Sequence, residues 1–225
     1  ENAAQIPEAF AFYKNSRARP SSSRAARWRG ERCRDTGRGQ VDFIGVWDTV
    51  GALGVPTRVL AFMDEKDLFF DRDLGSNVKV ARHAVAIDER RADFTPTLWG
   101  DKAAGSVEQV WFAGVHADVG GGYKRSDDDN LLSDIPLAWM AGEAKTAGLE
   151  FERHLYVKAK LDHRARQHKS HRSFWRALGR ERREIPPDAV LHTSVRKRFE
   201  QCDYAPRQLE EWLQRRDGDW GQLAS

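Results

Sequence analysis

Residues 110–123 read VWFAGVHADVGGGY, an apolar run that leads into a histidine and then three consecutive glycines. An apolar run of this length, bounded by glycine, is typical of a strand buried inside a sheet. Such a strand brings His116 to its carboxyl end, on backbone that lets a ligand approach closely. Because imidazole exchanges protons near neutral pH, we predict that His116 transfers protons. The alternative is a structural histidine at the end of a strand.

A second segment, residues 41–54, repeats the pattern as VDFIGVWDTVGALG and delivers Asp48 into a glycine-containing turn. An aspartate before Thr and Gly is also a common turn or helix cap, so a purely structural role is the alternative. Asp88 follows the apolar end of residues 78–87 in the same way. The carboxyl ends of parallel strands meet at one edge of a sheet, and ligands bind there. We therefore expect Asp48, Asp88 and His116 at one edge.

The order of the expected elements favours an α/β fold with a largely parallel sheet between helices. We predict strands over residues 41–47 and 107–115. Residues 78–87 are ambiguous and could form a helix that runs into a short strand over 83–87. Helices are expected over residues 7–17, 133–148, 169–183 and 207–215.

Composition limits the class of protein. The chain has 225 residues and a net charge of +3, and 40% of its residues are hydrophobic. It contains no apolar run near the roughly 18 residues that cross a bilayer, and its start lacks the features of a signal peptide. The two cysteines indicate neither a disulfide framework nor a zinc site. We expect a single partial domain over residues 1–225, with its core in 5–150 and a basic, less regular part in 151–225.

Several blocks with consistent spacing resemble the DUF2235 family of α/β-hydrolases, which includes the Tle1-type phospholipase effectors of bacterial type VI secretion. The blocks are FIGVWDTVGALG (43–54), HAVAIDERR (83–91), WFAGVHADVGGGY (111–123), LLSDIPLAWM (131–140) and HTSV (192–195). The similarity runs over roughly residues 5–206. It implies an α/β-hydrolase-like fold and a Ser-Asp-His triad. The family's glycine-flanked nucleophile serine and its first strand are absent from these residues, so we expect the fold to be incomplete at the N-terminus.

In the triad that the resemblance implies, His116 is the general base and Asp48 the acid that orients it. Asp88 is the rival acid and His192 an alternative base. The serines at residues 21–23 lack the flanking glycines of a nucleophile elbow, and we do not assign them this role. His116 and Asp118 with the acidic residues 127–129 could bind a hard cation, but the acidic run lacks the spacing of a calcium loop. We expect no metal and no cofactor.

The resemblance implies a serine esterase or lipase that acts on lipid esters, most simply a phospholipase, and that is inactive in these 225 residues alone. It also implies a lipid or phospholipid substrate, peripheral contact with membranes, an immunity or secretion-apparatus partner, and a bacterial cytoplasmic location before type VI export. Two alternatives come from other classes: a catalytically inactive binding domain, and a nucleic-acid-binding module built on the basic segments 17–38 and 158–198. Because basic segments are usually solvated surface, we expect no nucleic-acid partner.

Overall fold

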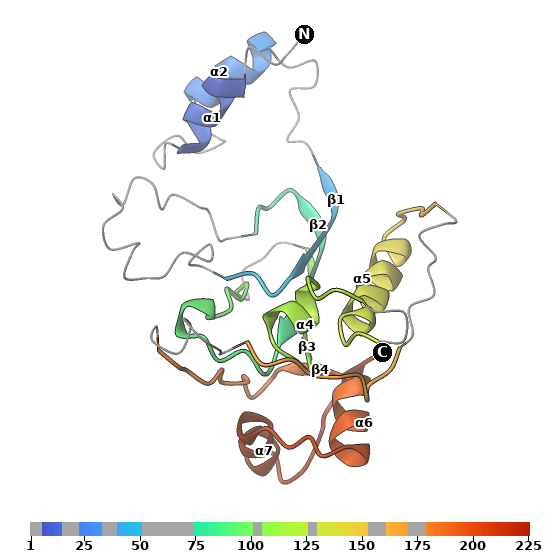
Figure 1. The fold of residues 1–225 in the computed structure, drawn as a ribbon. Coiled ribbons are helices and arrows are strands. Elements are labelled where there is room, and N and C mark those ends of the chain that lie inside the picture. The colour runs from blue at the N-terminus through green and yellow to red at the C-terminus, as the bar shows by residue number, and fades with distance from the viewer. Residues whose placement is uncertain are drawn as a thin grey trace.

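A five-stranded parallel sheet forms the centre of the structure, a computed structural model (Figure 1). Its strands lie in the order β1-β2-β3-β4-β5, and every neighbouring pair is parallel. The structure describes residues 6–14, 23–32, 40–50, 74–100, 105–125, 130–152, 161–170 and 179–225. The strands are β1 Val41–Trp47, β2 Val78–Ala86, β3 Ser106–Phe112, β4 Val190–His192 and β5 Leu223–Ala224. The predicted α/β-hydrolase-like fold class is confirmed.

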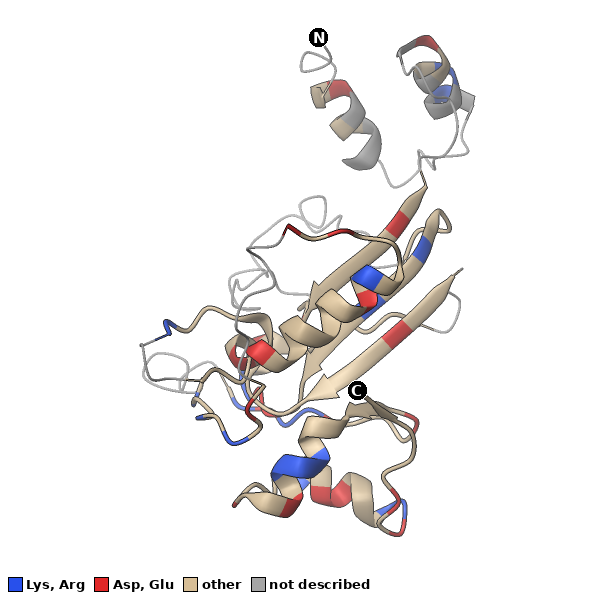
Figure 2. Cartoon of the chain, turned by 90° about the vertical axis from the view of Figure 1, so that its right-hand side faces the viewer, with Lys and Arg blue, Asp and Glu red and all other residues tan. Residues whose placement is uncertain are grey.

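Helices cover both faces of this sheet. The α-helices are α1 Ile6–Lys14, α2 Ser23–Arg32, α4 His116–Gly120, α5 Asp134–Thr146, α6 Thr193–Gln201 and α7 Arg207–Gln214, and η3 Ala92–Phe94 is a 3₁₀ turn. Along β2 and β3 successive side chains point to opposite faces. Ala84 and Phe112 pack with residues of α4 and α5, whereas Val85 and Trp111 pack with residues of α6 and α7. The result is a three-layer arrangement, in which α5 lies over the strands in Figure 2.

Strand β1 has the bounds that its apolar run predicts, and α5 approaches it closely. A Cβ on Gly45 would lie 2.6 Å from the Sδ atom of Met140 on α5. A side chain at this position would force the Met140 side chain to move, because real Cβ atoms are essentially never found so near another heavy atom. Among the described residues β1 pairs only with β2, and it is half-buried rather than covered on both faces.

The helical alternative for the first half of residues 78–87 is wrong, because β2 is one continuous strand from Val78 to Ala86. It pairs along its length with β1 and, from Val80 onward, with β3. Pairing on both edges satisfies its backbone hydrogen bonds and outweighs the local pattern, which mixes apolar and basic residues. Strand β3 ends at Phe112, so the predicted strand 107–115 extends three residues too far.

The helices expected over residues 133–148 and 207–215 are present as α5 and α7, and α1 lies within and just before the range expected for the first helix. Gly148, in the left-handed region at φ +97°, follows α5 directly after Ala147 and ends it. Residues 171–178 of the helix predicted over 169–183 lie outside the described residues, and the described residues on either side of them are not helical. In the described part of the chain, every helix is too short or too polar to cross a membrane.

Candidate active site

The carboxyl ends of β1 and β3 bring Asp48 and His116 together. Asp48 follows β1 with φ +45°, a left-handed conformation that Asp tolerates better than most residues. His116 begins α4 after a bend at Gly114, where φ is +118° and a Cβ would lie 2.5 Å from the Cβ of Asp118. The two strand ends lie close together because β1 and β3 flank β2 in parallel.

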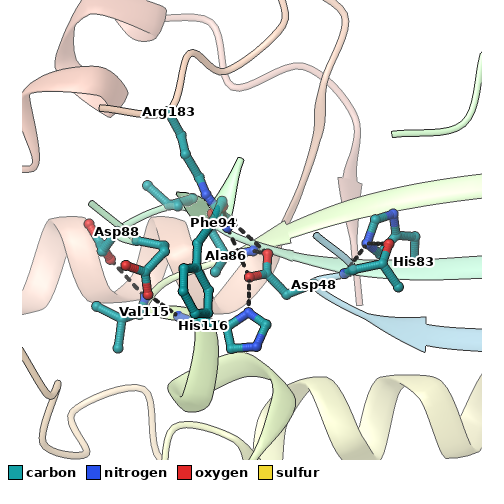
Figure 3. A network of polar contacts seen from close by, with 12 residues as sticks. Asp48, His83, Ala86, Asp88, Phe94, Val115, His116 and Arg183 are labelled. Carbon is teal, nitrogen blue, oxygen red and sulfur yellow. Dashed lines mark hydrogen bonds and ion pairs between the residues drawn. The ribbon is translucent and has the colours of Figure 1, made fainter. Parts of the chain in front are cut away.

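The Nδ1 atom of His116 lies 2.6 Å from the Oδ2 atom of Asp48 (Figure 3). Asp48 is fully buried, whereas 31% of the His116 side chain is exposed. The ring of Phe94 packs edge-on against the imidazole, with the ring centres 5.1 Å apart. Among the described residues the Nε2 atom of His116 makes no hydrogen bond. One imidazole nitrogen is therefore fixed by a carboxylate, and the other is open to a reacting group.

Arg183 holds the other side of the Asp48 carboxylate. Its Nη1 atom donates to Oδ1 at 2.5 Å and its Nη2 atom to Oδ2 at 2.9 Å, and the same two nitrogens donate to the carbonyl oxygens of Ala86 and Phe94, both at 2.6 Å. This two-pronged geometry is the one that guanidinium groups adopt with carboxylates. Figure 3 shows the carboxylate between the guanidinium and the imidazole.

These partners keep Asp48 ionised. Burial alone would raise the pKa of its carboxyl group, but the hydrogen bond with His116, the charge and hydrogen bonds of Arg183, and the Ala86 N–H at 2.8 Å lower that pKa to about 2. A carboxylate that is charged at neutral pH can orient the imidazole and stabilise an imidazolium.

Glu89 fixes the backbone that carries His116. The buried carboxylate accepts the His116 N–H at 3.2 Å through Oε2, and the side chain of Arg91 donates to both of its oxygens. Burial raises the pKa of Glu89, yet the hydrogen bonds and charge of Arg91 and the Ser170 hydroxyl lower it to about 2. A charged Glu89 thus anchors the first residue of α4.

Asp88, the rival acid of the sequence analysis, lies at the same edge of the sheet but makes no hydrogen bond to His116. Its Oδ2 atom accepts the Gly114 N–H at 2.7 Å and the Tyr204 hydroxyl at 3.0 Å. Burial raises the pKa of Asp88 to about 6, against the opposing effect of these hydrogen bonds. In this position Asp88 joins β2, the loop after β3 and the segment before α7.

His192, the alternative base, has other contacts than His116. It is the residue before α6, and its Nδ1 atom accepts the N–H of Ser194 at 3.1 Å. Burial lowers the pKa of His192 to about 4, so the ring is neutral at pH 7.

Asp118 accepts the Val115 N–H at 3.1 Å and so orders the loop before α4, and its other oxygen lies 2.7 Å from Nδ1 of His168.

Sequence reasoning missed three residues that support the site: Arg183, Glu89 and the fully buried His83. His83 accepts the N–H of Thr49 through Nε2 at 3.2 Å, while its Nδ1 lies 3.3 Å from Oε1 of Gln109. The hydrogen bond from Thr49 to His83 fixes the residue that follows Asp48. Burial lowers the pKa of His83, which suits a neutral ring with one accepting nitrogen. Only Glu89 had a local signal, since it lies three residues after the end of β2, next to Asp88.

The described residues contain no group of three or more His, Cys, Asp or Glu side chains that could hold a metal ion. The acidic run at 127–129 lies outside the described residues. An imidazole that a carboxylate holds by one nitrogen and that is open at the other can transfer protons to and from a hydroxyl group or water.

Comparison with known proteins identifies the family. No curated protein and no solved structure matched the chain. The family model described as the type VI secretion phospholipase effector Tle1-like catalytic domain matches residues 1–143, which include Asp48, Asp88 and His116. Since the match covers more than half of the chain, the protein belongs to the Tle1-like family of type VI secretion phospholipase effectors, and residues 1–143 are part of its catalytic domain.

Proposed function

We propose that the protein hydrolyses the carboxylic ester bonds of phospholipids, with His116 as general base and Asp48 as the acid of a Ser-Asp-His triad. The observation that carries this proposal is the 2.6 Å contact between Asp48 and Nδ1 of His116, with Nε2 left open. The phospholipase family to which the chain belongs supports the substrate class.

In the proposed mechanism each group has its own step. Nε2 of His116 accepts the proton of a serine hydroxyl as the serine oxygen attacks the acyl carbonyl, and Asp48 stabilises the imidazolium that forms. The imidazolium then gives this proton to the departing alcohol oxygen, which leaves an acyl-enzyme. His116 next takes a proton from water, the resulting hydroxide attacks the acyl carbon, and the serine recovers its proton from His116.

The serine is proposed to lie outside these 225 residues. Among the described residues no hydroxyl group bonds to His116, and β1 has a free edge on the side away from β2. A further parallel strand on that edge would end beside Asp48, at the edge of the sheet that carries His116. A serine after such a strand would be within reach of Nε2.

The family match supports a proposal for the partners. We propose lipid or phospholipid as the substrate, peripheral contact with a membrane, and export from the bacterial cytoplasm by type VI secretion, with an immunity or secretion-apparatus protein as partner. A module that only binds nucleic acid would leave the buried Asp48 and its bond to His116 without a purpose.

The test uses the full-length protein that contains this chain. Phospholipid hydrolysis is measured for the wild type, His116→Ala and Asp48→Asn, with circular dichroism as a control for folding. Both variants are expected to lower kcat by about 10³-fold or more, because triad members act as one unit. Equal activity in all three proteins would remove the assignment. An inactive wild type would favour a binding domain.

A further inference from the structure

A pocket of about 650 Å³ opens at the edge of the sheet that carries the proposed catalytic pair. Asp88 and Val115, which follow β2 and β3, form part of its wall, so it lies at the carboxyl edge of the sheet and one residue from His116. Its volume lies within the range of pockets that take small organic ligands. Figure 2 shows loops with Lys and Arg gathered around the arrowhead ends of the strands.

Positive charge dominates this pocket. Arg90, Lys169 and Arg180 line it, and we call these three residues the cationic pocket; His168 also lies in its wall. In the described part of the chain, Arg90, Lys169 and Arg180 make no ion pair. The acid in the wall, Asp88, is buried and already accepts hydrogen bonds from Gly114 and Tyr204.

Hydrogen bonds hold the segments of the cationic pocket in place. The backbone N–H of His168 donates to Asp118 at 3.1 Å, its Nδ1 atom lies 2.7 Å from the same carboxylate, and the Tyr123 ring stacks on the imidazole with centres 3.6 Å apart. The Ser170 hydroxyl donates to Glu89 at 2.8 Å. These contacts leave Nε2 of His168 without a partner among the described residues.

The opposite side of the pocket is tied down in a similar way. The backbone of Arg180 forms a bridge with Arg91, and the N–H of Glu181 donates to the carbonyl oxygen of Arg90 at 3.0 Å. The cations therefore come from three separate segments whose backbones are fixed relative to the end of β2. A chance run of basic residues along one exposed segment would not enclose a pocket in this way.

We propose that the cationic pocket binds the phosphate group of the phospholipid substrate and so presents its acyl ester to His116. The inference rests on the proposed function and names the part of the substrate that the chain recognises. Guanidinium groups bind phosphate oxygens in pairs, and an ammonium group adds further donors. The pocket is concave and lies at the same edge of the sheet as the catalytic pair, which fits a single headgroup better than an extended nucleic-acid strand.

The test compares two short-chain esters with identical acyl chains, dihexanoylphosphatidylglycerol and dihexanoylglycerol, in the full-length protein. The pocket variant is Lys169→Gln/Arg180→Gln, both exposed residues. The control variant Lys197→Gln/Arg207→Gln removes the same charge from exposed positions on α6 and α7. The ratio of kcat/KM for the phospholipid over the neutral ester is expected to fall about tenfold or more in the pocket variant, and to stay constant in the control.

Equilibrium binding separates this inference from the proposed function. In the His116→Ala background, the Kd of dihexanoylphosphatidylglycerol by calorimetry should rise about tenfold or more with the pocket substitutions. If the wild type hydrolyses neither ester, the proposed function fails while this Kd still reports on phosphate recognition.

Four results would overturn the inference. Two of them are an unchanged ratio of kcat/KM and an unchanged Kd for the phospholipid in the pocket variant. The third is that the pocket variant loses the binding of inorganic phosphate but keeps phospholipid turnover. The fourth is that the pocket substitutions weaken only the binding of a single-stranded oligonucleotide. The third would identify a site for free anions and the fourth a nucleic-acid site.

Discussion

Replacement of Arg183 by Met tests whether the buried ion pair behind Asp48 stabilises the structure. The substitution removes two hydrogen bonds to the carboxylate and one each to the carbonyl oxygens of Ala86 and Phe94. It leaves a fully buried carboxylate without its strongest countercharge. Loss of one partner of such a pair costs about 3–5 kcal/mol, so we expect the free energy of unfolding at pH 7 to fall by that amount.

The pH dependence of this loss follows from the pKa of Asp48. In the folded protein that pKa is about 2, against an ordinary value of 3.8 for aspartate. The difference corresponds to about 2 kcal/mol of stability that is present above pH 4 and is lost as the pH falls toward 2. Without Arg183 burial dominates and the pKa of Asp48 rises. The stability difference between wild type and variant should therefore shrink by about 1 kcal/mol or more between pH 7 and pH 3.

The assay is urea unfolding of the full-length protein, followed by tryptophan fluorescence at pH 7 and pH 3. Arg182→Met is the matched control, because its side chain is 42% exposed and lies 4.0 Å from Glu211. Such an exposed pair contributes about 0–1 kcal/mol. A loss below about 1 kcal/mol for Arg183→Met at pH 7, or the same loss at both pH values, would refute the reasoning.

Three further outcomes are expected in the same unfolding assay. Burial raises the pKa of Asp88 to about 6 in the folded state, so stability should fall as the pH rises from 4 to 6, by up to about 3 kcal/mol. Asp88→Asn should flatten that fall in stability. An unchanged slope of stability against pH in this variant would show that Asp88 is not its cause. Tyr204→Phe removes the hydroxyl bond to Asp88 and should cost about 1 kcal/mol at pH 5, where no loss would mean that the bond is not formed. Gly114→Ala places a Cβ 2.5 Å from the Cβ of Asp118 at a φ of +118° and should cost about 1–3 kcal/mol, whereas Gly142→Ala on α5, where the new Cβ meets nothing within 4 Å, should be neutral or stabilising. Equal effects of the two glycine substitutions would contradict the close contact.

The two strand ends that carry the proposed catalytic pair could be predicted from the sequence for a physical reason. An apolar run followed by a polar residue and glycine marks where a buried strand leaves the sheet. Parallel strands leave it at the same edge, which is why Asp48 and His116 could be placed near each other although 68 positions separate them. The choice between Asp48 and Asp88 as partner of the imidazole could not be made from the strand pattern alone, because both follow strands at this edge.

Other features left no local signal. Arg183 lies among several charged residues, 135 positions from Asp48, and nothing in its immediate sequence distinguishes it from its exposed neighbour Arg182. The basic residues of β2 find their neighbours only when β1 and β3 pair with that strand, so the local sequence does not mark it as a strand. Helix α6 contains four basic or acidic residues in nine, so its short buried face is inconspicuous in the sequence. These features depend on tertiary contacts between distant segments.

The activity of Asp48→Asn relative to Asp88→Asn in the full-length protein tests the central claim most directly. Both substitutions remove one buried carboxylate at the same edge of the sheet, but only Asp48 contacts the imidazole of His116. We expect kcat for phospholipid hydrolysis to fall about 10³-fold or more in Asp48→Asn and less than about tenfold in Asp88→Asn. The reverse order would assign the acid to Asp88 and contradict the account.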